Sequence, residues 1–337
     1  MSRRRCVLVI LVASFGAGSN LDADESPSLP DKVKAAISKA IPLLEKGTAG
    51  SADQRQCFTC HNQALPILAL VEARKRGFGL DEPNLERQLR HTLDHLERGR
   101  ENYLEGRGQG GKVITAGYAL WALESGGQQP TDATAAVTRF LLEYQKDADH
   151  WTHPGNRPPS SGSEFTTSYV ALRGLAGFGT SEQRPEIVAR TKRVYDWLQS
   201  SSPLDTEDRV FRLWALVNVA AGEEFLKAAV SELVDRQRDD GGWAQADDMQ
   251  SDAYATGTVL VVLLRTGSVC ANHPAVRRGV DFLLRTQNDD GSWHVVSRAE
   301  PFQTYFETGF PHAKDQFISI SASSWATLAL LLSLETD

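Results

Sequence analysis

Two kinds of hydrophobic pattern alternate along the chain. In the first, apolar residues recur on one face at helical spacing, as at Val276, Val280 and Leu283, which predicts an amphipathic helix. In the second, nearly every residue is small or apolar, as in the stretches 118–123 and 322–332. A helix of that composition is expected only where it is buried on every face. The alternation therefore predicts amphipathic helices packed around a layer of fully buried ones.

A sequence repeat sets the size of each unit. The segments Gln237–Trp243 and Gln287–Trp293 share the pattern Q-x-D-D-G-x-W at a separation of 50 residues. An amphipathic helix precedes each copy, and Asp-Asp-Gly supplies a turn in which the glycine is free to take positive φ. A repeat of this length indicates stacked supersecondary units. Weaker copies occur at Gln145 with Trp151, at 197–199 and at 85–104.

Counted from residue 31, these units predict six helical hairpins. The first is expected at about 31–45 and 63–75, and no linker rich in Pro, Gly or Ser divides the series apart from the short loop 154–163. We therefore predict an all-α fold, a single (α/α)6 toroid in which the six hairpins form two concentric helix rings.

The N-terminal residues have a different character. Arg3, Arg4 and Arg5 precede the apolar stretch 6–17, and small residues follow. This order is typical of a secretory signal peptide, and the apolar stretch is shorter than the roughly 18 to 20 residues of a spanning helix. We predict a signal peptide at 1–23 and the toroid domain at 24–337, periplasmic or secreted, with no stable membrane span after cleavage. An uncleaved anchor is the alternative.

Composition and charge limit the classes of binding partner that we expect. The 337 residues are 41% hydrophobic and 23% charged, which is typical of a globular protein. The formal net charge is −7, and no basic stripe is present that would hold phosphates. We therefore expect neither a nucleic-acid partner nor a nucleotide cofactor.

The repeat resembles a known one. The segment 277–293, with its Gln287 and Trp293, is similar to the QW repeat of squalene-hopene cyclases and their prenyltransferase relatives, whose fold is an α/α toroid. The repeating pattern of helices resembles that family over nearly all of 24–337. A full match to the QW motif occurs only at Gln237–Trp243 and Gln287–Trp293. It implies that Gln and Trp tie neighbouring hairpins together, so that Trp243 and Trp293 are scaffold residues.

This sequence also departs from the pattern of that family. Hopene-type cyclases protonate their substrate with a D-x-D-D box, and the segment 247–252 does not match it. Those enzymes also use two helical domains, whereas one is predicted here. A prenyltransferase would need zinc ligands on the last inner helices and a partner subunit, but Cys270 falls in the wrong loop. A terpene cyclase-like or prenyltransferase-like enzyme, or an isoprenoid- or lipid-binding protein without haem, is thus the alternative function.

Acidic residues allow a third hypothesis. Asp247, Asp248 and Asp252 precede a buried helix and could act as general acid and base on a polysaccharide. Aspartate at a helix start is more often an N-cap, and this is the simpler interpretation of Asp252.

A second motif lies in the first hairpin. Cys57-Phe-Thr-Cys60-His61 is a C-x-x-C-H box, the attachment pattern of c-type haem. Two cysteines three residues apart lie on one side of a helical turn, and the adjacent histidine can reach the iron. Export strengthens this interpretation, because bacterial c-type haem is attached outside the cytoplasm. A Cys57–Cys60 disulfide is an alternative that leaves His61 unexplained.

Zinc is a further alternative for the same box, but it needs a fourth ligand and there is no second cysteine pair. If haem takes two of the cysteines, Cys270 remains and is expected to be a buried thiol.

The position of the box favours a site at the centre of the ring. Alignment of Leu65 with Tyr118 places His61 just before the first inner helix, among the inner-helix N-termini where enzymes of this toroid family hold catalytic groups. Asp252 has the equivalent position in the fifth hairpin. The aromatic-rich connection 294–317 belongs to the sixth hairpin, which ring closure brings beside the first.

The sixth ligand of the iron would come from this region. His312 in the long connection and Met249 on the same rim are the candidates, and an open position is the alternative. The segments 57–66 and 301–312 together resemble an uncharacterised bacterial subgroup of cyclase-like proteins with a haem motif.

The main hypothesis is thus an exported toroid with one covalent haem c at Cys57, Cys60 and His61. It would perform electron transfer, with a periplasmic redox partner, or haem-based chemistry on a small apolar ligand in the ring. Whether it is an enzyme is left open.

Overall fold

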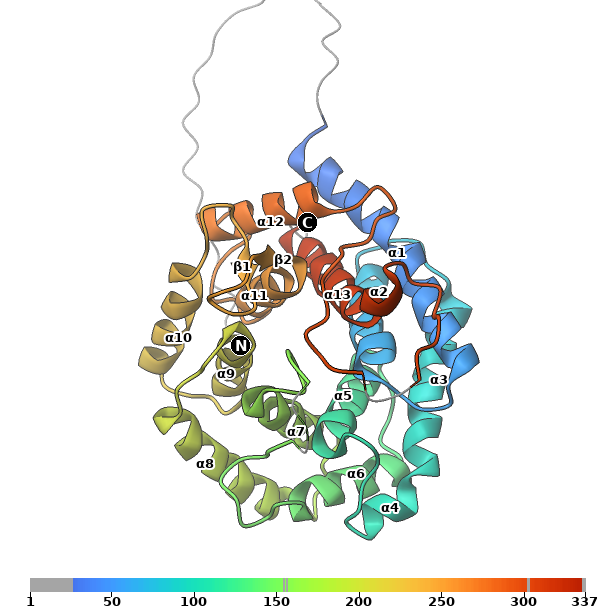
Figure 1. Cartoon of the computed structure of the whole chain (residues 1–337). Coiled ribbons are helices and arrows are strands. Elements are labelled where there is room, and N and C mark those ends of the chain that lie inside the picture. Colours follow the sequence, from blue (N-terminus) through green and yellow to red (C-terminus); the bar gives the residue numbers. More distant parts are fainter. Residues whose placement is uncertain (1–26, 154, 156, 302–303, 335–337) are drawn as a thin grey trace, which may run out of the picture.

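A ring of helices forms the molecule (Figure 1). The computed structural model describes residues 27–153, 155, 157–301 and 304–334. The predicted signal peptide at 1–23 lies outside the described residues. Within them, six helices form an inner ring and six an outer ring, so the predicted (α/α)6 toroid is confirmed. The inner helices are α2 (Leu65–Lys75), α5 (Lys112–Ser125), α7 (Glu164–Phe178), α9 (Thr206–Asn218), α11 (Ala253–Arg265) and α13 (Gln316–Ser333).

The outer helices alternate with them along the chain. They are α1 (Leu29–Gln54), α3 (Glu82–Arg98), α6 (Asp132–Glu143), α8 (Arg184–Ser200), α10 (Glu223–Asp235) and α12 (Pro274–Thr286). Short elements complete the fold: α4 (Arg100–Leu104), the π-helix η1 (Cys60–Ala64), the 3-10 helix η2 (Ala313–Asp315) and the strand pair β1 (Trp243–Ala244) and β2 (Ser251–Asp252). The ring closes where α13 packs against α2 and α1.

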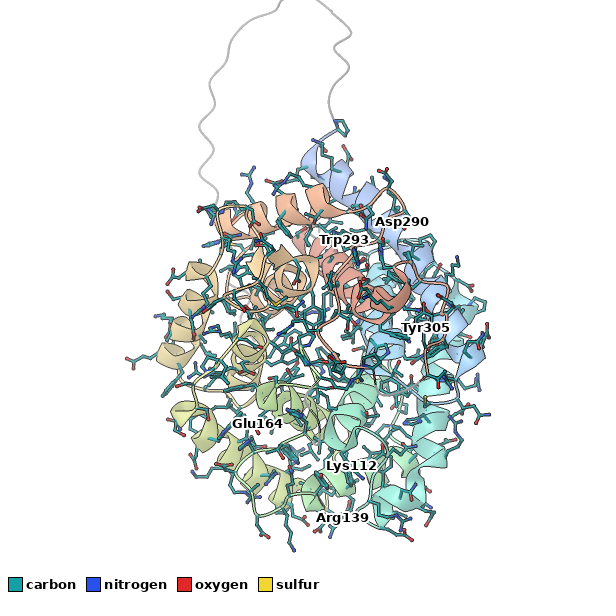
Figure 2. All side chains as sticks on the ribbon, viewed as in Figure 1. Lys112, Arg139, Glu164, Asp290, Trp293 and Tyr305 are labelled. Carbon is teal, nitrogen blue, oxygen red and sulfur yellow. The ribbon has the colours of Figure 1, made fainter. Side chains whose placement is uncertain are left out.

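Small residues let the inner helices approach closely. At Gly257 on α11, an added Cβ would lie 2.8 Å from the backbone nitrogen of Ala326 on α13, so only glycine fits. Bulky side chains fill the rest of the interior (Figure 2). Trp293, for example, is 1% exposed, whereas the charged side chain of Arg139 lies at the outer edge of the ring.

The repeated Gln residues tie neighbouring hairpins together, as predicted, whereas the hydrogen bonds of the repeated Trp indoles lie within one hairpin. The amide of Gln237 donates to the carbonyls of Gly241 in its own turn and Ala275 in the next outer helix, both at 2.8 Å. Gln287 repeats this with Gly291 at 3.0 Å and Ala36 at 2.9 Å, which joins the last hairpin to the first. The indole N–H groups of Trp243 and Trp293 donate to the carbonyls of Leu233 and Leu283.

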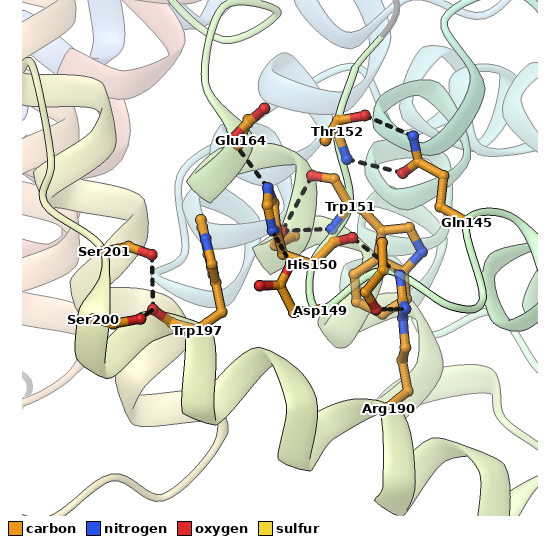
Figure 3. Close-up of polar contacts among 12 residues, drawn as sticks. Gln145, Asp149, His150, Trp151, Thr152, Glu164, Arg190, Trp197, Ser200 and Ser201 are labelled. Carbon is orange, nitrogen blue, oxygen red and sulfur yellow. Dashed lines mark hydrogen bonds and ion pairs between the residues drawn. The ribbon is translucent and has the colours of Figure 1, made fainter.

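The third copy keeps the tryptophan bond, but its glutamine does not tie the two hairpins (Figure 3). The indole of Trp151 donates to Leu141 at 2.9 Å, as in the other copies. Gln145 instead bonds Thr152 and does not reach the next outer helix. Arg190 on α8 takes over the tie: its guanidinium donates to loop carbonyls such as that of His150 and lies 4.1 Å from the Trp151 ring centroid.

Two local predictions differ from the structure. The last inner helix begins at Gln316, earlier than the stretch 322–332 predicts, because the polar residues of its first turns are also buried. Cys270 is exposed rather than buried, since it lies in the loop after α11. By length and mean hydropathy (1.3), Ala313–Ser333 qualifies as a candidate membrane span, yet 78% of its apolar window is buried inside the ring.

Candidate functional site

The inner helices all begin at one end of the ring, because each follows an antiparallel outer helix. We call this end, formed by the first turns of α2, α5, α7, α9, α11 and α13, the N-terminal mouth. The opposite end, formed by their last turns, is the C-terminal mouth. Most of the residues singled out in the sequence lie at the N-terminal mouth.

The most unusual group there is the carboxyl of Glu207, on the first turn of α9. Glu207 is 3% exposed and faces two other inner helices. Its oxygens accept from Thr166 Oγ1 at 2.8 Å and from Tyr254 OH at 3.2 Å. Burial raises the pKa of this carboxyl to about 8, although the Thr166 bond opposes the shift. Glu207 is therefore mainly a neutral acid at pH 7.

The residues around Glu207 form an acidic box that sequence reasoning missed. Asp205-Thr206-Glu207-Asp208 has the form D-x-E-D, which differs from D-x-D-D only in having Glu for Asp at the middle acid. Asp205 caps α9 by accepting from the backbone N–H of Asp208 at 3.0 Å, and the Asp208 carboxylate accepts from that of Leu204 at 2.9 Å. The outer two acids hold the turn and the middle one faces inward. The segment 205–208 is thus a nearer match to D-x-D-D than 247–252.

An aromatic cluster fills the ring beyond the acid. Trp214 lies two turns further along α9, about 10 Å from Glu207 in helix rise. Its ring centroid is 5.1 Å from that of Trp121, 5.0 Å from Tyr169 and 5.8 Å from Trp325. Tyr118 stacks on Trp121 and is fully buried. These π faces are suited to a positively charged species, which aromatic rings attract.

The C-x-x-C-H box occupies the same mouth, beside the first inner helix. His61 lies in the π-helix η1, a distortion that is frequent at functional sites. Thr59 caps η1 by accepting from the Asn62 N–H at 3.2 Å, and its own N–H donates to Gln63 Oε1 at 2.9 Å. This local bonding fixes the backbone that carries His61.

The His61 side chain is half-buried, but its Nε2 is buried and the imidazole is neutral. Its Nε2 has no hydrogen-bond partner within the part of the chain that the structure describes, and its ring packs edge-on against Phe317 at 5.2 Å. Burial, assisted by Arg157, lowers the pKa of His61 to about 4. The Cys57 thiol is exposed and that of Cys60 half-buried, and burial raises the pKa of Cys60 to about 12.

The predicted distal ligands lie elsewhere on the rim. His312 Nε2 is 2.7 Å from Ser292 Oγ, and the His312 ring stacks on His294 at 4.6 Å. Met249 is half-buried in the loop before α11, where its carbonyl accepts from Arg238. None of the contacts described for either residue involves His61. In the long connection, Phe306 packs on Phe317, whose ring contacts His61.

The other acidic candidates are separate from Glu207. Asp252 is the N-cap of α11: it accepts from the Ala255 N–H at 2.9 Å and from Gln245 at 2.8 Å, so its predicted capping role is confirmed. Asp247 and Asp248 are exposed, and Asp247 pairs with Arg236 at 2.8 Å. Among the described residues, no group of three or more His, Cys, Asp or Glu is placed to hold a metal ion, so the zinc alternative finds no ligand set there.

Comparison with known proteins points to one family for the C-terminal part. Residues 206–330, which start inside the acidic box, match the squalene-hopene cyclase C-terminal domain. The squalene–hopene cyclase of Bradyrhizobium diazoefficiens is 32% identical over 107 residues, which are 28% of this chain and 15% of that protein. Protostadienol synthase A of Arthroderma gypseum is 32% identical over 111 residues, again 15% of its length. The matches therefore span only a small part of these relatives.

Solved structures extend the likeness to the whole ring. The type II terpene cyclase MstE from Scytonema superposes with a TM-score of 0.56 at 16% identity, covering 90% of this chain and 98% of that one. The fold is the α/α toroid of terpene cyclases. The ent-copalyl diphosphate synthase of Streptomyces platensis has a TM-score of 0.51 at 20% identity over 80% of this chain and 50% of that one. At these identities the superpositions show the fold alone.

Proposed function

We propose that this protein is an acid-initiated enzyme of the type II terpene cyclase kind, in which Glu207 protonates an alkene of an isoprenoid substrate. The observation that carries the proposal is a buried, neutral carboxyl in a D-x-E-D box at the start of an inner helix. The match of 206–330 to the squalene-hopene cyclase C-terminal domain and the likeness to MstE support it.

The first step would move one proton. The π electrons of the alkene form a new C–H bond with the Glu207 proton, and a carbocation remains on the neighbouring carbon. Thr166 Oγ1 and Tyr254 OH stay within hydrogen-bond reach of the carboxylate that is left. Loss of a proton from the final cation ends the reaction, so the net change is an isomerisation that needs no co-reactant.

Burial has two opposing effects on this step. A pKa of about 8 keeps the proton on Glu207 at neutral pH, but it also makes the carboxyl a weaker acid. The reaction must therefore gain its driving force from stabilisation of the cation. The rings of Tyr118, Trp121 and Trp214 supply π faces for that purpose.

Product analysis tests this proposal. Purified protein is incubated with squalene or geranylgeraniol, and cyclised products are measured by gas chromatography with mass detection. We expect Glu207→Gln to lower product formation by about 10² to 10⁴-fold, the usual contribution of a general acid. Glu97→Gln, the same change at an exposed site on α3, is the matched control and should behave as wild type. Equal products from Glu207→Gln and wild type would refute the role of Glu207.

A second candidate function rests on the C-x-x-C-H box, and we propose it beside the first. The donor set suits a c-type haem: Cys57 and Cys60 would form the thioether bonds, and His61 Nε2, buried and unpartnered among the described residues, would bind the iron. Neutral imidazole is the form that ligates iron, which agrees with a pKa of about 4. A bound haem would supply one-electron redox chemistry at the N-terminal mouth. Export and a redox partner remain part of this proposal.

Haem attachment has a readout that needs no substrate. After co-expression with a cytochrome maturation system, the protein should show sharp bands in a reduced-minus-oxidised spectrum and keep its haem through acid-acetone extraction. The double variant Cys57→Ala/Cys60→Ala should lose the haem stain, and Cys270→Ala should keep it. A mass equal to the bare polypeptide in the wild type would refute the haem proposal.

A further inference from the structure

The C-terminal mouth holds a cavity of about 210 Å³, at the opposite end of the ring from Glu207 and His61. Five of the inner helices contribute aromatic or charged residues to its wall. The aromatic part consists of Trp121, Tyr169 and Trp214, each at most 5% exposed. The charged part consists of Glu72, Lys75, Arg173 and Arg265.

Positive charge exceeds negative charge around this cavity. Glu72 is the carboxylate in the wall, and it already binds Arg76 at 2.9 Å and Arg265 at 3.3 Å. Arg173 pairs with Glu124, just outside the wall, at 2.8 Å. Lys75 has no ion pair with any residue that the structure describes. Among the described residues, two carboxylates thus pair with three of the four cations Lys75, Arg76, Arg173 and Arg265.

The preference for cations at helix C-termini explains only part of this excess of positive charge. Lys75 and Arg265 lie in the last turns of α2 and α11, where cations stabilise the exposed carbonyl groups. Arg173 lies further back on α7, and its guanidinium stands 5.0 Å from the Trp121 ring centroid. Burial lowers the pKa of Arg265; the Glu72 carboxylate opposes this, and Arg173 lowers it further. Both guanidiniums line the same cavity, where their like charges repel each other, and a bound anion would relieve that repulsion.

We infer that the C-terminal mouth binds the anionic head group of an amphiphilic ligand, held by Lys75, Arg173 and Arg265, with its apolar part against Trp121 and Trp214. The head group is a phosphate or a carboxylate, since guanidinium groups bind both. The cavity is smaller than the roughly 300–1,000 Å³ of most ligand pockets, which favours a short prenyl or acyl chain. The ligand would share Trp121 and Trp214 with the chemistry proposed for Glu207, but the anion site itself consists of Lys75, Arg173 and Arg265 and does not depend on proton transfer by Glu207.

Three matched probes test the inference by calorimetry: geranyl phosphate, geranic acid and geraniol. At least one of the two anions should bind about tenfold or more tightly than the neutral alcohol, and whichever binds better identifies the head group. The difference in affinity between the better-binding anion and geraniol should decrease as the salt concentration is raised. Lys75→Gln and Arg173→Gln should each weaken anion binding about five- to tenfold and leave geraniol binding unchanged. Arg74→Gln is the control, because Arg74 lies on the same helix but pairs with Glu82 outside the cavity.

Two results would overturn the inference. One is equal affinity for geraniol and for both anions; the other is that Lys75→Gln and Arg173→Gln bind the anions as Arg74→Gln does. If Arg173→Gln fails to fold, Lys75→Gln still decides the matter, because the Lys75 side chain makes no described ion pair. Glu207→Gln should bind geranyl phosphate as wild type does, so a failure of the acid proposal is distinguishable from a failure at this mouth.

Discussion

At the scale of the residue, what separates Glu207 from its neighbours is the direction of its side chain. Asp205 and Asp208 accept backbone N–H bonds and stabilise the start of α9. Glu207 lies between them in sequence but turns inward, where side-chain hydroxyls are its partners. One tetrapeptide thus supplies two structural acids and one buried acid.

The raised pKa of Glu207 predicts how stability varies with pH. The folded state keeps the proton up to about pH 8, whereas an unfolded glutamate loses it near its ordinary value of 4.5. Between these values the unfolded state binds fewer protons, so the free energy of unfolding must fall as pH rises, by at most about 1.4 kcal/mol per unit. Denaturant unfolding from pH 6.5 to 8 should show this fall in wild type and much less of it in Glu207→Gln.

The comparison with Glu207→Gln separates this slope from that of His61, which has a folded pKa of about 4 and an ordinary pKa of 6.5. Near pH 6.5 His61 is neutral in the folded state and about half protonated in the unfolded state, so it adds an opposing slope that is the same in both proteins. Identical pH profiles for the wild type and Glu207→Gln would mean that Glu207 is ionised in the folded protein.

At the scale of the element, caps and repeated tryptophans make each hairpin a stable unit. Asp252 ends the β1–β2 loop and starts α11 with one side-chain bond. The indole N–H of Trp293 donates to the Leu283 carbonyl on α12 of its own hairpin, and the Trp293 backbone N–H donates to Ser323 Oγ on α13 at 3.0 Å. These contacts lie within one hairpin and form with little help from the rest of the ring.

Loss of the Asp252 cap should lower stability without affecting the acid site. We expect Asp252→Ala to reduce the free energy of unfolding by about 0.5–2 kcal/mol, since an unmet N–H remains at the start of α11. Asp252→Asn keeps an acceptor and should lose much less. Thermal unfolding of the three proteins checks this, and equal losses for Ala and Asn would argue against a capping role.

Truncation of Trp293 should have a larger effect. Trp293→Ala removes a large buried aromatic and is expected to cost about 3–5 kcal/mol in denaturant unfolding. Trp293→Phe keeps most of the apolar contact, loses the bond to Leu283 and should cost clearly less. A loss below 1 kcal/mol for the alanine variant would contradict the scaffold role.

At the scale of the whole molecule, closure of the ring depends on bonds between the ends of the chain. Gln287 reaches the Ala36 carbonyl on α1, whereas Gln237 makes the equivalent bond to the adjacent hairpin. Both glutamines make the same two kinds of bond, so the two sites form an internal comparison of closure with ordinary stacking.

We predict that Gln287→Ala and Gln237→Ala each lower stability by about 1–3 kcal/mol, the sum expected for two hydrogen bonds. The location of the effect should differ. Hydrogen exchange should accelerate in α1 for Gln287→Ala and in α12 for both variants, with α1 little changed in Gln237→Ala. If hydrogen exchange changed at the same positions in both variants, the interface between the last and first hairpins would not differ from the other interfaces between hairpins.

The amino-acid sequence by itself determined the ring. The helical periodicity, the buried inner stretches and the Q-x-D-D-G-x-W turns are all encoded within units of about 50 residues, where local propensity and turn chemistry act. Tertiary structure decided which carboxylate is an acid. Asp252 and Glu207 both stand at the start of an inner helix, but only the latter is enclosed by hydroxyls from α7 and α11.

Tertiary structure also decided that Arg190 makes the tie between hairpins that Gln145 does not make. It likewise decided that cations from α2, α7 and α11 gather at the C-terminal mouth. Desolvation and charge repulsion depend on neighbours that are distant in sequence, and these neighbours meet only once the ring has closed.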